Sequence, residues 1–244
     1  FTTLPFDLGG LVLWLDADDD ETFDLNGADR VISWFDKSDY NRETNQTNNS
    51  YRPIRITYPR NPAMHVLSAD NADLELLNGG LATYDIYQVF RTSVSNDFVG
   101  YEAIVGARLS TERTYLTQPN TNKFHVSSAP GEIYQDGKLV TDLTLLDLED
   151  FTAVYTEARN PGALRDVFIN SREGSRGYTY LAEILVFDKK KTAANRDGIF
   201  KYLMDKWDLT GPKVISTNPV DNEASAPTTA ANSISLEFDR PIFK

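Results

Sequence analysis

Short apolar runs recur along the first 190 residues, and each is bounded by polar or glycine-containing stretches. The run Leu-Val-Leu-Trp-Leu at 11–15, for example, follows two glycines and precedes an acidic stretch. Runs of this length that are rich in β-branched and aromatic residues are typical of buried strands. Because no helical pattern separates them, they predict an all-β fold with antiparallel sheets. The runs that we assign to strands are 11–15, 31–35, 86–90, 103–105, 151–155, 167–169 and 184–187.

The strongest turn signal is Asp136-Gly137, which lies between the strand-like segments 133–135 and 138–140. Asp-Gly readily adopts the positive φ values of a type I′ turn, so this segment predicts a hairpin.

Residues 192–207 have helical spacing instead. Apolar side chains at 199, 200, 203, 204 and 207 recur three or four positions apart, and Thr192 is a suitable N-cap. We expect one amphipathic helix whose apolar face, including Trp207, packs on the sheets.

A second unit is expected after Gly211-Pro212, which divides the chain into residues 1–211 and 212–244. Two strand-like segments, 214–216 and 234–238, are too little to bury a core alone. Residues 212–244 are therefore expected to be either the opening of a truncated domain or a tail that pairs with a partner. The chain begins at Phe1 and lacks a signal-like segment, so we also expect it to be a piece of a longer protein.

Composition excludes several classes of protein. The net charge of −12, with no compensating basic stripe, disfavours nucleic-acid binding. Because the chain has no cysteine, disulfides and thiolate chemistry are excluded. No apolar run approaches the length of a transmembrane helix, so membrane insertion is not expected.

The order of the segments is similar to that of a known family. The sequences LVLWLDA at 11–17 and RVISWFDKS at 30–38 resemble the opening of bacterial laminin-G-like domains, in which a WLDA strand precedes a W-x-D-K-S-G-N segment. The stretch AMHVLSADNADLEL at 63–76 and the segment 180–209 resemble later parts of the same family. The resemblance covers about residues 8–210 and implies a concanavalin A-like jelly roll of two antiparallel sheets. The family's glycine-rich S-G-N-G-N-H loop is replaced here by Ser38-Asp39-Tyr40-Asn41-Arg42, which has no glycine and no histidine.

Residues 212–244 resemble the first part of a bacterial Ig-like domain, which opens with P-x-V-x-x-x-x-P-x-D. Such tandem modules occur in large secreted surface proteins and adhesins, and in phage fibre and decoration proteins. The resemblance therefore implies an extracellular, cell-surface or virion-surface location.

Catalysis is not expected. Jelly-roll glucanases need paired carboxylates on one face of a strand, and the chain has no Glu-x-Asp-x-Glu triplet. The two histidines, His65 and His125, lie in apolar stretches, and no Gly-x-Ser-x-Gly sequence provides a nucleophile. A pair of carboxylates brought together from different strands would reopen the alternative of a glycoside hydrolase or lyase.

Two acidic groups could hold one structural Ca²⁺, since this ion binds carboxylate and carbonyl oxygens at loop rims. The ligands that we assign to it are Asp18, Asp20, Asp70 and Asp73. A solvated acidic loop is the alternative. By contrast, we expect Asp16 and Asp36, which directly follow apolar runs, to accept backbone N–H groups and fix their loops.

Sugar binding requires exposed aromatic rings beside amide or carboxylate groups. The long polar stretch 40–51, which has a tyrosine at each end, is the best candidate. The ligand-binding residues that we assign are Tyr40, Asn41, Asn45, Tyr51, Tyr178 and Tyr180.

The sequence thus favours a non-catalytic adhesion or recognition module that binds a glycan or a surface protein. The alternative is a structural element of a phage fibre, capsid decoration or cell-surface filament that self-assembles through residues 212–244.

Overall fold

The computed structural model describes residues 5–58, 61–77, 80–92, 105–107, 132–141, 151–164, 167–172, 175–176, 178–209, 214–218 and 235–238. The chain divides into two compact units, Phe1–Leu209 and Thr210–Lys244. Within the described residues, the first unit contains two principal antiparallel sheets and one α-helix. The coarse prediction of a sandwich-like, mostly β fold with one helix therefore agrees with the structure.

The larger sheet has eight strands in the order β11-β10-β12-β8-β16-β6-β5, and β1 also pairs with β16. Along β16, the first residues pair with β6 and the last residues pair with β1, so these two strands lie on the same edge of β16. The strands of this large sheet are β1 (Leu11–Asp16), β5 (Ile54–Thr57), β6 (His65–Asp70), β8 (Leu81–Thr92), β10 (Ile133–Gln135), β11 (Lys138–Leu139), β12 (Thr152–Leu164) and β16 (Tyr178–Phe187).

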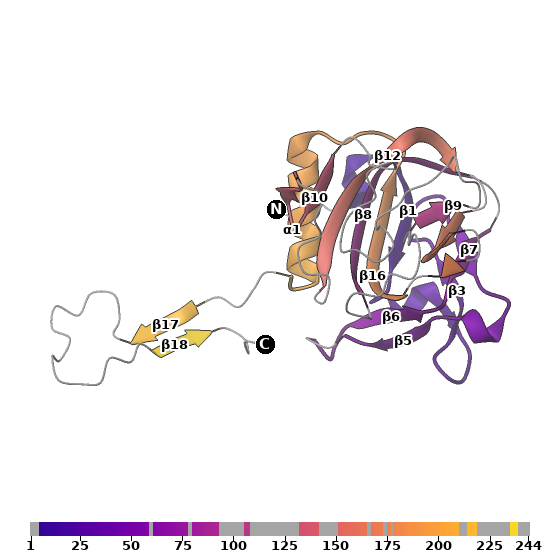
Figure 1. The fold of residues 1–244 in the computed structure, drawn as a ribbon, viewed down its shortest axis with the longest axis horizontal. Helices are drawn as coiled ribbons and strands as arrows, with labels where there is room; N and C mark the ends of the chain where they lie inside the picture. The colour runs from indigo at the N-terminus through magenta and orange to yellow at the C-terminus, as the bar shows by residue number, and fades with distance from the viewer. Residues whose placement is uncertain are drawn as a thin grey trace. The chain divides into compact units, whose positions relative to one another are not determined.

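The smaller sheet has six strands in the order β2-β3-β4-β7-β13-β9. It lies against one face of the large sheet, and α1 (Ala193–Lys206) covers the other face (Figure 1). The strands of this small sheet are β2 (Phe23–Leu25), β3 (Val31–Phe35), β4 (Glu43–Asn45), β7 (Leu74–Leu76), β9 (Val105–Ala107) and β13 (Val167–Ile169). A separate ribbon pairs β14 (Ser171–Arg172) with β15 (Ser175–Arg176), and the 3₁₀ helices are η1 (Pro5–Leu8), η2 (Asp20–Thr22) and η3 (Asn49–Tyr51).

Helix α1 begins and ends as its sequence predicts. The Thr192 side chain accepts a hydrogen bond from the backbone N–H of Asn195, and Trp207 is the C-cap. Phe200 packs with its ring centroid 5.8 Å from that of Tyr87 on β8. Trp207 is completely buried, so the expected apolar face is confirmed.

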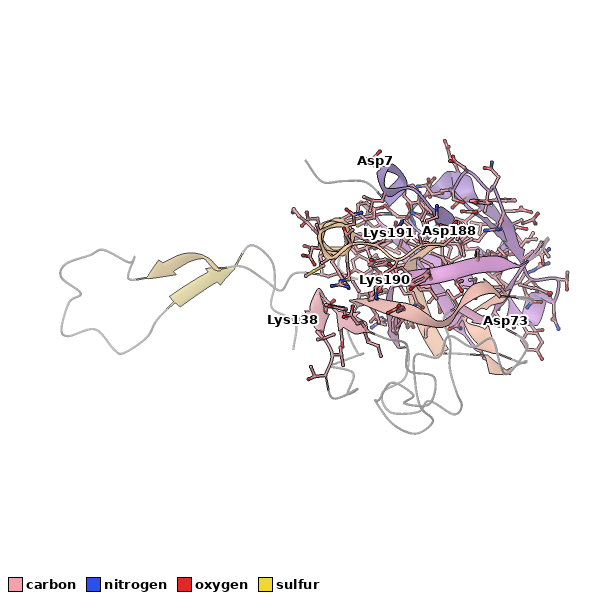
Figure 2. The ribbon with its side chains drawn as sticks, turned by 90° about the horizontal axis from the view of Figure 1, so that it is seen from above. Asp7, Asp73, Lys138, Asp188, Lys190 and Lys191 are labelled. Carbon is pink, nitrogen blue, oxygen red and sulfur yellow. The ribbon has the colours of Figure 1, made fainter. Side chains whose placement is uncertain are left out.

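The segment between β16 and α1 is tied to the sheet at Lys191 (Figure 2). The backbone N–H of Lys191 donates to Asp85 Oδ2 at 2.6 Å, and its ammonium donates to the carbonyl oxygen of Gly9 at 2.5 Å. Burial raises the pKa of Asp85. The neighbouring Gly10 has a φ of +73°, which favours glycine, and a Cβ there would also displace the Asp188 carboxylate.

The Asp136-Gly137 hairpin is also confirmed. Both residues have positive φ values, +49° and +77°, and the flanking strands β10 and β11 pair antiparallel. In the second unit, β17 (Val214–Asn218) pairs antiparallel with β18 (Ser235–Phe238).

Candidate functional site

The loop that follows β3 is fixed by the carboxylate of Asp36. Its Oδ1 accepts hydrogen bonds from the backbone N–H groups of Trp14 and Ser38, both at 2.8 Å. Its Oδ2 accepts from the Ser38 hydroxyl at 2.7 Å and from the Arg42 backbone N–H at 3.3 Å. The backbone N–H of Lys37 then donates to the Trp14 carbonyl. The loop thus provides hydrogen-bond partners for the N–H and the carbonyl of Trp14, which lie on the edge of β1 that is not paired with β16. This confirms the structural role expected of Asp36.

Tyr40 lies at the tip of this loop. It is 55% exposed, more than any other large hydrophobic side chain of the described residues. The Arg42 guanidinium lies 4.7 Å from the ring centroid, and Arg42 Nη1 also donates to the Val12 carbonyl. Asn41, which is also exposed, adopts a φ of +48° in the turn. An exposed aromatic ring and an amide are therefore presented side by side on an anchored turn.

The other assigned ligand residues lie elsewhere. Asn45 is half-buried at the end of β4. Tyr51 is the last residue of η3, which follows β4, whereas the Tyr40 loop precedes β4. Tyr180 lies on β16 in the large sheet. The side chain of Tyr178 is outside the described residues. The structure therefore places Tyr40 and Asn41 together but distributes the remaining residues over other parts of the two sheets.

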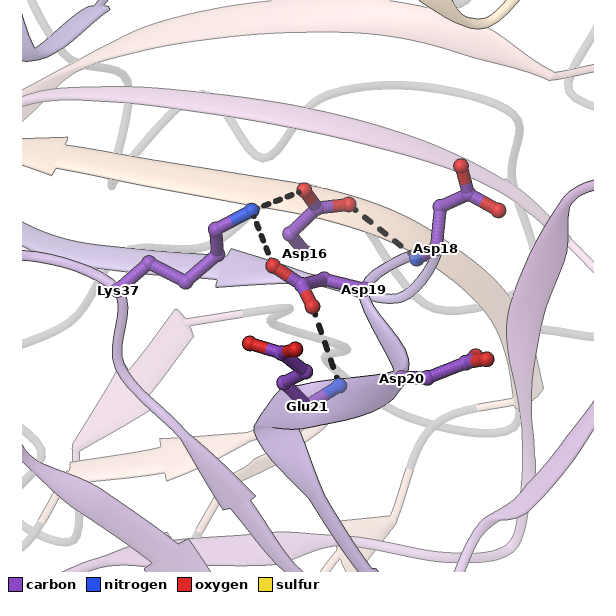
Figure 3. Close-up of a pocket in the computed structure, with 6 residues that line it drawn as sticks. All are labelled: Asp16, Asp18, Asp19, Asp20, Glu21 and Lys37. Atoms are coloured by element: carbon purple, nitrogen blue, oxygen red, sulfur yellow. Dashed lines mark hydrogen bonds and ion pairs between the residues drawn. The ribbon is translucent and has the colours of Figure 1, made fainter.

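The acidic stretch after β1 forms an open depression of about 390 Å³ lined by Asp16, Asp18, Asp19, Asp20, Glu21 and Lys37 (Figure 3). Lys37 Nζ lies 2.9 Å from Asp16 Oδ2 and 2.6 Å from Asp19 Oδ2. Asp20 pairs with Arg55 at 2.5 Å, and Asp18 accepts a hydrogen bond from the His65 backbone N–H. Most of these carboxylates therefore already have a protein partner.

The pKa values of this ion-paired group follow from the same contacts. Partial burial alone would raise the pKa of Asp19, but the hydrogen bonds from Lys37 and from the Glu21 N–H hold it below its ordinary value. Burial alone would lower the pKa of Lys37, and its hydrogen bonds to Asp19 and Asp16 raise it instead. Both groups are thus held in their charged forms.

The four aspartates assigned to Ca²⁺ do not meet at one point. Asp18 contacts the first residue of β6, His65, whereas Asp70 is the last residue of the same strand. Five residues of extended strand span about 17 Å, far beyond the reach of one ion. Asp73 is buried, and its Oδ1 accepts from Gln46 Nε2 at 2.5 Å. Among the described residues, no group of three or more acidic or histidine side chains could hold a metal ion.

Sequence reasoning missed a fully buried carboxylate with four side-chain partners, Glu183 on β16. It is completely buried, and its two oxygens accept from the indole N–H groups of Trp14 and Trp207, each at 2.7 Å. The Tyr202 hydroxyl donates at 2.8 Å, and Lys206 Nζ lies 3.1 Å away. Three of these donors belong to α1 or its cap, so the network fastens the helix to the sheet. A glutamate inside the apolar run of 181–187 was the only sequence signal for it.

This network brings two carboxylates together, because Lys206 Nζ also lies 2.7 Å from Asp16 Oδ1. Burial raises the pKa of Glu183, although Lys206 and the Trp207 N–H oppose that effect. Glu183 has no exposed surface, so a substrate cannot contact its carboxylate as the chain is folded. Of the two candidate bases, His65 is half-buried in β6, and His125 lies outside the described residues.

No helix in the described part of the chain combines the length and apolar character needed to cross a membrane. No family model matches this chain, and no curated protein matches it. Among solved structures, the chain is similar to a protein described as a mutant of Trypanosoma rangeli sialidase displaying trans-sialidase activity. The identity is 12%, the TM-score is 0.41, and the match covers 81% of this chain and 33% of that one. The chain therefore spans about a third of that protein's length, and a similarity at this level carries no argument about activity.

Proposed function

We propose that residues 1–211 form a non-catalytic recognition module with a concanavalin A-like jelly roll of the laminin-G-like kind, and that the module binds glycans at a cell or virion surface. The proposal combines the two packed antiparallel sheets with the sequence resemblance of residues 8–210. Residues 212–244 are proposed to open an Ig-like domain in the same surface protein. The location outside the cell rests on the resemblance alone.

The observation that carries the proposal is the anchored Tyr40 loop. An aromatic ring binds the apolar face of a sugar by stacking, and neighbouring amides bind its hydroxyls. A fixed loop loses little conformational entropy when it binds, which favours affinity. Tyr40 and Asn41 offer both kinds of contact, and the Asp36 hydrogen bonds hold them in place.

A glycan array probed with the full chain tests this proposal. We expect selective binding that Tyr40→Ala reduces by about tenfold or more, since stacking and burial of a ring contribute more than 1 kcal/mol. Leu139→Ala is the matched control, because Leu139 is 52% exposed on β11 and lies outside the loop. A chain that binds no glycan, or that loses binding equally in both variants, contradicts the proposal. Release of a reducing sugar from any bound glycan would contradict its non-catalytic part.

A second candidate function is assembly with other protein chains. It is favoured by the strand pair β17–β18 in the second unit, because no further strand pairs with either of them among the described residues and a lone pair of strands is marginally stable. Addition of this strand pair to the edge of a partner's sheet would pair one of its two edges. Light scattering of the full chain distinguishes the two functions. Ordered multimers without glycan binding favour assembly, and a monomer that binds a glycan favours recognition.

A further inference from the structure

A row of side chains crosses the large sheet on the face that α1 partly covers. Arg91 on β8 lies directly opposite Tyr180 on β16. On β6, Ser68 lies opposite Tyr180 on one side and opposite Ile54 of β5 on the other. Directly opposed residues in antiparallel strands point to the same face of a sheet. All four residues are half-buried, so each retains some surface open to solvent.

An irregularity in β16 places this row on the same side as the helix. Tyr180 and Glu183 are three positions apart and would face opposite sides of a regular strand. The pairing with β8 shifts by one residue between Leu181 and Glu183. This shift turns Tyr180 toward the face on which Glu183 binds Trp207. The row therefore lies on the helix-bearing face of the large sheet.

The Arg91 guanidinium is held between aromatic rings. It lies 4.2 Å from the ring centroid of Tyr180 and 5.7 Å from that of Phe151. Phe151 belongs to the buried cluster around Trp207, because Tyr58 contacts both rings. Within the described part of the chain, these two rings are the contacts that orient the guanidinium.

Arg91 differs from the other arginines whose side chains are described. Its Nε is buried without a hydrogen-bond acceptor, as is that of Arg196, but no other guanidinium nitrogen of Arg91 donates to an oxygen of the described residues either. No acidic side chain in that part of the structure forms an ion pair with it. The arginines that instead donate to a protein oxygen are Arg30, Arg42, Arg52, Arg55 and Arg196.

Arg91 is half-buried, so its guanidinium keeps some surface for a ligand. An oriented guanidinium suits a carboxylate, which can accept two parallel hydrogen bonds from its Nη groups. With a net charge of −12, the chain has more carboxylates than cations, so a cation without a carboxylate partner is unexpected. We infer that Arg91 anchors the carboxylate of an acidic saccharide, such as a uronic acid, on the row formed with Tyr180, Ser68 and Ile54. The inference rests on the proposed glycan-binding function but not on the Tyr40 loop.

The composition of the row favours a saccharide over an acidic peptide. Beyond Arg91, it offers the aromatic edge of Tyr180, the hydroxyl of Ser68 and the aliphatic surface of Ile54. These match the alternating apolar and hydroxyl groups of a sugar. A peptide that bound by adding a strand would need an open sheet edge, and in the middle of this row β16 and β6 are each paired on both sides, at Tyr180 and at Ser68.

Isothermal titration of the full chain with a short oligogalacturonate and with its methyl ester tests the inference. The two probes share a sugar backbone and differ only in the carboxylate. We expect the acid to bind about tenfold or more tightly than the ester, since charge-assisted hydrogen bonds contribute about 1.5–3 kcal/mol. Arg91→Met should abolish this preference, and Arg91→Lys, which keeps the charge but loses the planar fork, should retain only part of it.

Lys138→Met is the matched control, because it removes the same charge from the exposed hairpin strand β11 (Figure 2). It should retain the preference, and melting curves of all variants should show folded protein. Equal binding of acid and ester, absence of binding, or an unchanged preference in Arg91→Met would overturn the inference. Polyglutamate that binds as tightly as the oligogalacturonate would overturn the assignment to a saccharide. If Tyr40→Ala abolishes binding of neutral glycans while Arg91→Met changes nothing, the proposed function stands and this inference fails.

Discussion

Two groups of carboxylates meet at Asp16 and differ in their access to water. On the helix side, Glu183 is fully buried and has hydrogen-bond donors or cations on both oxygens. On the other side, the depression around Asp19 and Asp20 is open, and the Asp20 side chain is 77% exposed. Asp16 belongs to both groups, since Lys206 binds one of its oxygens and Lys37 binds the other.

The difference shows that a cluster of acidic residues in the sequence does not identify the carboxylate that contributes most to stability. An exposed ion pair contributes little, because water screens it and its side chains lose entropy. A buried carboxylate that loses its charge leaves several desolvated donors without an acceptor. The four acidic residues of 18–21 are more conspicuous in the sequence, yet we expect the single glutamate of β16 to matter more for stability.

Replacement of Glu183 gives the largest expected effect. In Glu183→Gln, one carboxylate oxygen becomes an amide N–H group that faces donors, and Lys206 loses a buried counter-ion. We expect the free energy of unfolding to fall by about 3–5 kcal/mol, measured by denaturant titration. Asp205→Asn on α1 is the control, because its ion pair with Lys201 is exposed and should contribute less than about 0.5 kcal/mol. Equal effects of the two substitutions would contradict the comparison.

Replacement of Asp36 is expected to have the next largest effect. Asp36→Asn presents an N–H group to donors such as the Ser38 hydroxyl and the Arg42 N–H, and should cost about 2 kcal/mol. Asp39→Asn, in the exposed part of the same loop, should change stability by less than about 0.5 kcal/mol. If Asp36→Asn leaves both the melting temperature and glycan binding unchanged, the loop does not depend on this carboxylate.

Local sequence patterns predicted much of the fold and little of the Glu183 network. The helix at 193–206 and the hairpin at Asp136 depend on neighbouring residues, so spacing and turn chemistry were sufficient to find them. Trp14 donates to Glu183 across 169 positions of the chain, and only the tertiary fold sets that contact. The wrong grouping of Asp18 with Asp70 has the same cause. Both lie in acidic turns, but the tertiary fold places them at opposite ends of β6.

Removal of Lys37 should have a smaller, pH-dependent effect. Lys37→Met should cost about 1 kcal/mol at neutral pH, because its ion pairs are partly exposed. The pKa of Asp19 lies below its ordinary value in the folded chain, so ionised Asp19 stabilises the fold above its unfolded pKa of about 3.9. That stability is lost as the pH falls through the lower folded value.

Thermal melts of wild type and Lys37→Met from pH 7 to about pH 2 would check the sign. The gap in melting temperature should narrow below about pH 4, because Asp19 becomes protonated in both proteins. A gap that widens on acidification would contradict the assigned direction.

A chelator should have the smallest effect. Asp16, Asp19 and Asp20 are already paired with Lys37 and Arg55, and a divalent cation in the depression would have to compete with these internal cations. A stabilising ion raises the melting temperature by mass action, so its removal should lower it. We therefore expect the melting temperature to be the same with EDTA and with added Ca²⁺, within the error of a thermal scan. A Ca²⁺-dependent rise that Asp18→Asn and Asp20→Asn abolish would show instead that the depression, without Asp70 and Asp73, binds the ion.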